Sequence, residues 1–239
     1  MARLKEPGKP GNYRTIQQLM IKSLPFGVIF DMDGVLLDSE PFICKAAMMM
    51  FAERGLIVQP EDFLPFVGSG EDRFIGGVAE KYAFPLKLQP DKKRTYEIYL
   101  KIIRGQLHPL EGTLAFLESC RKSGKKMALA TSADYIKMAG NLKEIGVRSS
   151  SFDAVITGED VIHKKPNPEI FILAAKQMNL KPDECLVVED AINGVRAAKA
   201  SNSRCLALTT SFTKEQLFSA GADWCAENLA KAPKEALKW

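Results

Sequence analysis

Short runs of apolar residues recur along the chain, and each run ends at polar residues. The first covers residues 27–30, and later runs cover residues 127–130, 154–156, 186–188 and 205–208. Continuous apolar runs of this length are typical of parallel strands buried on both faces. Helical patterns separate the runs, such as Met138, Leu142 and Ile145, which are spaced four and three residues apart. The pattern predicts a doubly wound, Rossmann-like α/β fold, with helices on both faces of a parallel sheet.

Residues 41–105 interrupt this alternation, because their pattern predicts helices alone. The expected helices cover about residues 41–54, 61–67, 71–82 and 91–104. We therefore predict three parts: an N-terminal extension at residues 1–24, an α/β core at residues 25–40 and 106–239, and an inserted all-helical cap at residues 41–105. A cap placed after the first strand is expected to lie over the carboxyl ends of the strands, where such sheets bind ligands.

Composition and charge narrow the class of protein. Of the 239 residues, 46% are apolar and 26% are charged, which is typical of a globular protein with a sizeable core. The net charge is +4, and no run of five or six basic residues occurs, so nucleic acid is not an expected partner. No apolar stretch approaches the roughly 18 residues of a membrane span, so a membrane is not expected either.

The cysteines and the N-terminal residues indicate the cellular compartment in which the protein works. The five cysteines are odd in number and include no Cys-x-x-Cys pair, which argues against a zinc site or a disulfide framework. Free cysteines suit a reducing cytoplasm, which is the location we expect. The N-terminus lacks the apolar segment of a secretory signal. It is basic and poor in acidic residues but not rich in serine, so targeting to an organelle is the less favoured alternative.

The first strand ends in two carboxylates, Asp31 and Asp33. Residues two apart in an extended turn can project to one side. Two carboxylates held close together require a proton or a cation between them. Magnesium, which prefers oxygen ligands, would satisfy this requirement. A solvated acidic turn that needs Gly34 for its backbone explains the motif equally well.

A second strand ends in Glu189 and Asp190. Asp190 suits the N-cap of a helix that starts at Ala191. A second acidic strand end beside the first nevertheless favours a metal site over a cap alone, and both interpretations are compatible.

Two further motifs could bind phosphate. Thr131 and Ser132 follow a strand and precede a helix, where a hydroxyl and backbone N–H groups can hold an anion. Simple capping is the alternative for this pair. Lys165 could bind phosphate as a point charge and screen an anionic nucleophile, although an isolated lysine usually faces solvent. Lys164 is expected to face solvent.

Together the four motifs resemble the phosphatase and phosphoglucomutase-like branch of the haloacid dehalogenase superfamily, which carries a helical cap after the first motif. The matching segments are residues 31–41, 130–132, 165–168 and 188–190 with 193–194, within a resemblance that spans about residues 27–228. The resemblance implies that Asp31 is the nucleophile and that Asp33 acts first as general acid and then as general base. It also implies that Thr131 and Lys165 hold the transferring phosphoryl group, and Ser132 remains a candidate phosphate-binding residue from its position before the helix.

The resemblance further implies a magnesium site. Asp31, Asp190 and the backbone carbonyl of Asp33 would be ligands, with Glu189 either a direct ligand or placed behind them. It also implies that dehalogenases lack the second aspartate of the first motif, so the presence of Asp33 disfavours dehalogenation.

Phosphatases and sugar-phosphate mutases share this core, so the cap must separate them. The resemblance implies that mutases carry a cap histidine where this chain has Ile43, and a phosphate-binding cap arginine where it has Glu71. They continue the second motif with Ser-Lys-Asn, where this chain has residues 133–135, Ala-Asp-Tyr. Acidic residues at these places would repel a second phosphate, which favours a phosphatase. Arg73 could replace the missing arginine in a mutase.

The sequence therefore predicts a magnesium-dependent phosphatase that acts on a small phosphorylated metabolite of the sugar, polyol or nucleotide type. Specificity is expected from cap residues, among them Ile43, Ser69, Glu71 and Arg73. A mutase similar to β-phosphoglucomutase is the second candidate. A catalytically idle binding protein on the same scaffold is disfavoured, because every catalytic position is filled. A small phosphate ester is the expected partner, and a monomer is compatible with the sequence, which does not decide the oligomeric state.

Overall fold

The computed structural model describes residues 26–236 and 238. Within this part of the chain, six strands form one sheet in the order β3-β2-β1-β4-β5-β6, with every neighbouring pair parallel. The strands are β1 Gly27–Phe30, β2 Lys126–Ala130, β3 Ala154–Ile156, β4 Cys185–Glu189, β5 Arg204–Leu208 and β6 Trp224–Ala226. The first strand lies inside the sheet and the strand order runs outward from it in both directions, which confirms the doubly wound α/β fold.

Five of the six strands were predicted to within one residue at each end. The sixth, β6, was missed because it is a three-residue edge strand whose Trp224 and Cys225 are only half-buried. The helices of the core are α5 Thr113–Lys122, α6 Tyr135–Glu144, α7 Glu169–Gln177, α8 Ile192–Ala200 and α9 Lys214–Ser219. None of the described helices is long and apolar enough to cross a membrane.

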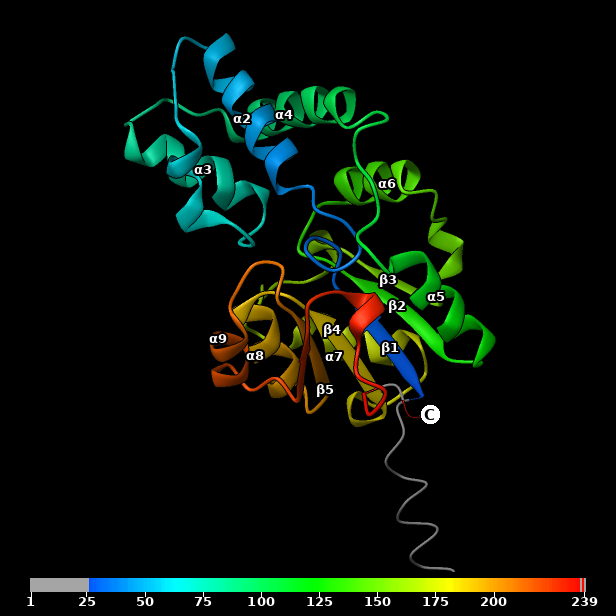
Figure 1. Cartoon of the computed structure of the whole chain (residues 1–239). Coiled ribbons are helices and arrows are strands. Elements are labelled where there is room, and N and C mark those ends of the chain that lie inside the picture. The colour runs from blue at the N-terminus through cyan, green and yellow to red at the C-terminus, as the bar shows by residue number, and fades with distance from the viewer. Residues whose placement is uncertain (1–25, 237, 239) are drawn as a thin grey trace, which may run out of the picture.

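Three helices lie above the sheet in the predicted cap region: α2 Glu40–Glu53, α3 Glu71–Lys81 and α4 Leu88–Ile102 (Figure 1). The helix predicted at residues 61–67 is wrong, because the chain forms two 3-10 turns there, Pro60–Asp62 and Leu64–Phe66. Pro65 falls inside the predicted helix, where it lacks the N–H donor that a continuous helix needs. The division into extension, core and cap stays a prediction, and the extension at residues 1–24 lies outside the described residues.

Apolar side chains pack on both faces of the sheet. On one face, Ile29 of β1 belongs to a cluster with Phe171 of α7 and Val195 of α8. On the other face, Phe30 belongs to a cluster that continues upward to Tyr99 of α4. The sheet and the helices above it therefore share a continuous apolar core.

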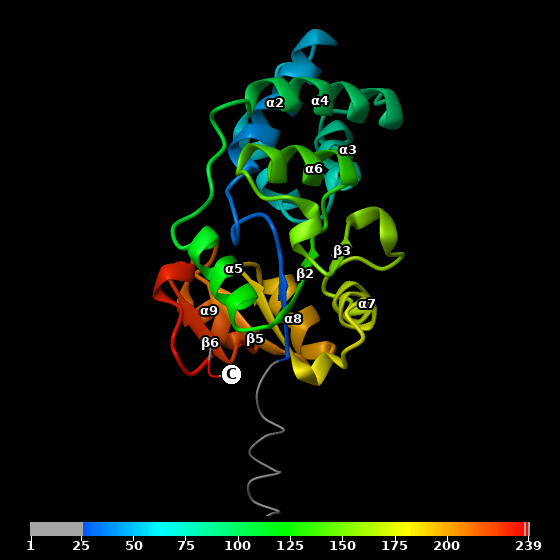
Figure 2. The same ribbon diagram turned by 90° about the vertical axis from the view of Figure 1, so that its right-hand side faces the viewer.

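Helix α6 joins the core to the helices above it, and Figure 2 shows α6 directly beneath α4. The Tyr99 hydroxyl of α4 donates a buried hydrogen bond to Asn141 of α6. A Cβ at Gly140 would overlap the side chain of Leu100, so the two helices approach closely at this glycine. This packing places the first turn of α6 beside the space between the sheet and α3.

Candidate active site

A cavity of about 870 Å³ lies between the carboxyl ends of the strands and the helices above them. This volume is within the usual range for small-molecule sites. The side chains predicted from the four motifs all line it: Asp31, Asp33, Thr131, Ser132, Lys165, Glu189 and Asp190. The parallel sheet explains the convergence, because the carboxyl ends of β1, β2 and β4 meet at one edge.

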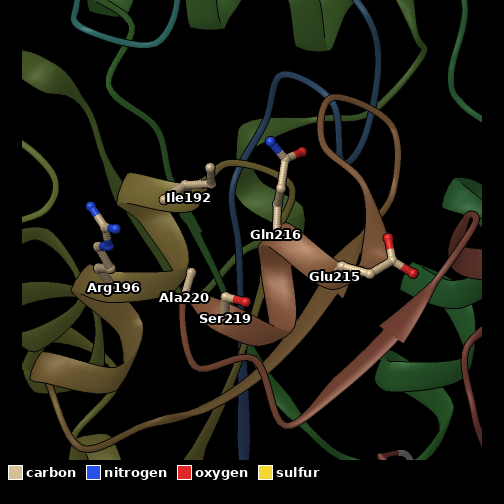
Figure 3. A pocket seen from close by; sticks show the side chains of 6 residues that line it. All are labelled: Ile192, Arg196, Glu215, Gln216, Ser219 and Ala220. Carbon is tan, nitrogen blue, oxygen red and sulfur yellow. The ribbon is translucent and has the colours of Figure 1, made fainter.

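A smaller hollow of about 290 Å³ lies between α8 and α9 (Figure 3). Its six lining residues include Arg196 and Glu215 but none of the predicted site residues. The candidate chemistry therefore belongs to the larger cavity.

Lys165 is the cation at the base of the cavity. Its Nζ lies 2.6 Å from Asp31 Oδ1 and 2.7 Å from Glu189 Oε1, and only 6% of its side chain is exposed. It also lies 4.9 Å from the centre of the Phe171 ring. Burial and the two carboxylates act on the lysine in opposite directions, and the carboxylates prevail, so its pKa is raised above the usual value. Lys165 is therefore charged at neutral pH.

Lys164 differs from its neighbour. It is exposed, and its Nζ donates to the backbone carbonyl of Gly158. The lysine directly before Pro166 thus reaches the cavity, whereas the preceding lysine stays at the surface.

Glu189 holds the loop after β4 rather than standing free. Its Oε2 accepts hydrogen bonds from the N–H groups of Asp190 and Ala191, at 2.8 and 2.9 Å. A Cβ at Gly194 would overlap the Glu189 carboxylate, so this position requires glycine. With Lys165 on Oε1, both oxygens of Glu189 are engaged, and a place behind the metal ligands suits it better than direct ligation.

The predicted capping of α8 by Asp190 is wrong. The helix starts at Ile192 with Ala191 as its N-cap, and no side chain caps it. The Asp190 carboxylate instead accepts a hydrogen bond from Ser211, and the neighbouring Thr210 hydroxyl donates to the backbone carbonyl of Gly34 at 2.6 Å. Asp190 is therefore held by the loop after β5 and faces the turn after β1.

Asp31 and Asp190 form a crowded acidic pair. Burial raises the pKa of Asp31 to about 7, although Lys165 opposes the shift. Burial, followed by the charges of Glu189 and Asp31, raises the pKa of Asp190 well above its usual range. The Asp190 carboxylate packs directly against Gly34, because a Cβ at that residue would overlap it. This excess of negative charge is the environment that a divalent cation relieves.

The donor set fits a hard cation held in part by the backbone. Among the described residues, no three His, Cys, Asp or Glu side chains form a complete metal-binding group. The two carboxylates Asp31 and Asp190 would form an all-oxygen set with the backbone carbonyl that the resemblance implies at Asp33. Magnesium accepts such a small set because it usually keeps several of its waters.

Asp33 is held by two partners that the sequence analysis did not connect with it. Ser39 donates to its Oδ1, and Lys137 Nζ lies 3.1 Å from its Oδ2. Only 3% of the Lys137 side chain is exposed. Lys137 was missed because a helical lysine usually faces solvent. The available signal was its position next to Met138 and four residues before Asn141, on the inner side of α6.

Thr131 presents a hydroxyl to the cavity from the end of β2. The residue is buried, and its Oγ1 accepts the N–H of Ala133 at 3.1 Å. Its hydroxyl proton therefore points elsewhere and can be donated to a phosphate oxygen. Ser132 also lines the cavity.

The predicted cap residues divide into two groups. Ile43 and Glu71 line the cavity, whereas Ser69 and Arg73 are absent from its described lining. The Ser69 hydroxyl donates to the backbone carbonyl of Phe66. Arg73 pairs with Glu80 at 2.7 Å and lies over the Phe66 ring, with half of its side chain exposed. Arg73 is therefore directed away from the cavity.

Two lysines form ion pairs with Glu71 and Asp134, the acidic residues that were expected to repel a second phosphate. Lys137 Nζ lies 3.4 Å from Glu71 Oε1. Lys92 of α4 bridges Asp72 and Asp134, at 2.6 and 2.8 Å. Glu71 and Asp134 are therefore paired with lysines and are not isolated negative charges.

The comparisons with known proteins agree on one family. The family model of the haloacid dehalogenase-like hydrolases matches residues 27–202. Protein SUPPRESSOR OF QUENCHING 1, chloroplastic, from Arabidopsis thaliana is 41% identical over 208 residues, which cover 84% of this chain and 19% of that protein. The chain thus spans about a fifth of the length of this relative.

Two further comparisons cover nearly the whole of the other protein. The fructose-1-phosphate phosphatase YqaB of Escherichia coli is 30% identical over 175 residues, covering 73% of this chain and 92% of YqaB. The crystal structure of CbbY from Rhodobacter sphaeroides in complex with phosphate has a TM-score of 0.78 and 23% identity, covering 87% of this chain and 96% of CbbY. The latter likeness shows the fold.

Proposed function

Because the chain belongs to the haloacid dehalogenase-like hydrolase family and is a phosphoric monoester hydrolase, we propose that it hydrolyses the monophosphate of a small metabolite through a phosphoaspartate at Asp31. The observation that carries the proposal is the convergence of Asp31, Asp33, Thr131 and Lys165 on one cavity. A sugar, polyol or nucleotide-type monophosphate fits a cavity of about 870 Å³. The name of YqaB supports the sugar-phosphate part of this range.

In the first step, a carboxylate oxygen of Asp31 attacks phosphorus, and the bond from phosphorus to the ester oxygen breaks. Lys165 bonds Oδ1 of Asp31 at 2.6 Å, so Oδ2 is the oxygen proposed to attack. Lys165 and Thr131 would also neutralise and orient the phosphoryl oxygens, which is the main requirement of phosphoryl transfer. Asp33 would donate its proton to the leaving alcohol.

In the second step, Asp33 takes a proton from water, and the water oxygen attacks phosphorus. The bond from phosphorus to Asp31 breaks, which regenerates the carboxylate and releases phosphate. Ser39 and Lys137 would keep the Asp33 carboxyl in one orientation through both steps. Magnesium on Asp31, Asp190 and the Asp33 carbonyl would supply charge neutralisation for the phosphoryl group.

We favour hydrolysis over mutase activity because the described lining of the cavity offers no cation without carboxylate contacts for a second phosphate. Among the described residues, its basic lining side chains are Lys137 and Lys165, and both contact carboxylates. Arg73, the candidate for a mutase grip, pairs with Glu80 outside the cavity.

The test measures phosphate release from a panel of sugar, polyol and nucleotide monophosphates, with magnesium or with EDTA. We expect release that depends on magnesium, and full activity in excess EDTA would overturn the metal site. A sugar 1-phosphate with a trace of sugar bisphosphate is then followed by phosphorus NMR. Free phosphate is the expected product, whereas rapid formation of the 6-phosphate would establish the mutase.

We also propose that residues 41–105 act as a cap over the core and that the protein works in the cytoplasm. The five cysteines are free, which suits a reducing compartment. One relative is named as a chloroplast protein, which supports the organelle alternative. A reporter fused after residues 1–24 tests the choice, and import of that reporter into an organelle would overturn the cytoplasmic assignment.

A further inference from the structure

The cap side of the cavity holds a carboxylate that the proposed mechanism does not use. Glu71, in the first turn of α3, is only 7% exposed and lines the cavity. Its Oε1 faces Lys137, but its Oε2 is buried without a hydrogen-bond partner among the described residues. Buried side-chain oxygens without a partner are uncommon, and each calls for an explanation. The Tyr96 hydroxyl is the other such atom, and Tyr96 is absent from the described lining.

Lys137 connects this carboxylate to the site of chemistry. Its Nζ lies 3.1 Å from Asp33 Oδ2 and 3.4 Å from Glu71 Oε1. One ammonium group thus touches both carboxylates, so their oxygens are close enough to contact neighbouring oxygens of one small molecule. In the proposed first step Asp33 would face the ester oxygen of the leaving alcohol, and Glu71 would then lie beside the next part of that alcohol.

The surroundings of Glu71 favour a neutral hydrogen-bond donor. Lys137 already serves three carboxylates, since Glu40 Oε1 also lies 3.8 Å from its Nζ. This negative surplus would repel a second phosphate. Apolar side chains of Ile43, Phe66 and Phe74 line the same cavity, so its wall on the cap side offers few other polar partners to a ligand. A hydroxyl group supplies the missing donor and adds no charge.

We propose that Glu71, held in place by Lys137, accepts a hydrogen bond from a hydroxyl of the leaving alcohol. The preferred substrates are then phosphate monoesters of polyols or sugars that carry a free hydroxyl one or two carbons from the ester. This proposal rests on the phosphatase function proposed for the same site and specifies its substrate class.

The experiment compares glycerol 1-phosphate with propyl phosphate, which has the same carbon chain without hydroxyls. The wild-type kcat/KM is expected to favour glycerol 1-phosphate at least about tenfold, the effect of one hydrogen bond to a charged group. Glu71→Ala should reduce this ratio to below about threefold. Asp72→Ala is the matched control, because Asp72 is the next residue of α3 and its exposed carboxylate pairs with Lys92. It should keep the wild-type ratio.

Four other results would contradict the proposed hydrogen bond between Glu71 and the substrate. If wild type releases nitrophenolate from p-nitrophenyl phosphate but does not distinguish the two alcohol esters, the inference is wrong while the phosphatase function stands. No phosphate release from any ester overturns both. Should Glu71→Ala fail to fold, wild type is tested with propane-1,2-diol 1-phosphate and its 2-O-methyl ether, which cannot donate. Equal rates overturn the proposal, as does a preference for the 2-amino analogue, which would make Glu71 an ammonium site.

Discussion

Replacing Lys165 with methionine tests the electrostatic core of the site. The change keeps most of the side-chain volume and removes one buried charge. Lys165 Nζ bonds Asp31 Oδ1 at 2.6 Å and Glu189 Oε1 at 2.7 Å, with 6% of the side chain exposed. Breaking a buried ion pair by removing one partner typically lowers the free energy of unfolding by about 3–5 kcal/mol. At roughly 2–4 °C per kcal/mol for a protein of this size, the melting temperature should fall by about 6–20 °C.

Activity should fall further than stability alone explains. Removing one preorganised charge or donor that faces the reacting group typically lowers kcat by roughly 10²–10³. Lys164→Met is the matched control, because Lys164 is the adjacent lysine, is itself exposed, and donates to the backbone carbonyl of Gly158. Surface substitutions of this kind usually change stability by less than about 0.5 kcal/mol.

The assay combines thermal melting in EDTA, so that no bound cation replaces the ammonium, with p-nitrophenyl phosphate turnover in magnesium at a temperature where both variants are folded. Lys165→Met should melt lower and turn over at least about a hundredfold more slowly than Lys164→Met. A Lys165→Met enzyme with more than a tenth of the wild-type kcat would refute the proposed role of the lysine. A larger effect of Lys164→Met would show that the other lysine reaches the phosphate.

Three further predictions follow from the same site. Asp31→Asn should retain the fold by circular dichroism and lose turnover, and a rate above a hundredth of wild type, with deamidation excluded by mass spectrometry, would contradict the nucleophile assignment. Gly194→Ala should displace the Glu189 carboxylate, which its new Cβ would overlap, and lower kcat together with the melting temperature; an unchanged kcat would mean that Glu189 does not support Lys165. In metal-free protein, burial raises the pKa of Asp31 to about 7, so the folded state binds more protons than the unfolded state. The free energy of unfolding should therefore fall as pH rises from 3.8 to about 7, and magnesium should stabilise the protein most at the upper end of that range. Melting curves recorded with EDTA and with magnesium check both expectations. A magnesium effect that does not depend on pH would count against the acidic pair.

The sheet could be predicted because its strands are buried on both faces. Runs such as residues 27–30 and 186–188 are apolar without interruption, and their polar ends mark the ligand-binding edge. The same rule fails for β6, where Trp224 and Cys225 are half-buried at the sheet edge. The helical prediction fails at residues 61–67, where Pro65 interrupts the pattern and the chain forms two short turns.

Those residues of the candidate site that directly follow a strand could be predicted from the sequence. Asp31 and Asp190 follow strands directly, so topology alone brings them together. Lys137 could not be found in this way, because it sits on a helix and its partners lie 104 residues earlier at Asp33 and 66 residues earlier at Glu71. The orientation of Arg73 away from the cavity likewise depends on Glu80 and Phe66, contacts that no motif encodes.

The central claim is that the phosphoryl group passes through Asp31, and the Asp33→Asn enzyme tests it most directly. Nitrophenolate leaves without a proton, so the first step with p-nitrophenyl phosphate should proceed, while hydrolysis of the intermediate lacks its general base. The enzyme is quenched after mixing, reduced with borohydride, which converts an aspartyl phosphate to homoserine, and mapped by peptide mass spectrometry. We predict about one nitrophenolate released rapidly per enzyme and homoserine at position 31. Release of nitrophenolate with Asp31 unmodified would contradict covalent catalysis by this residue.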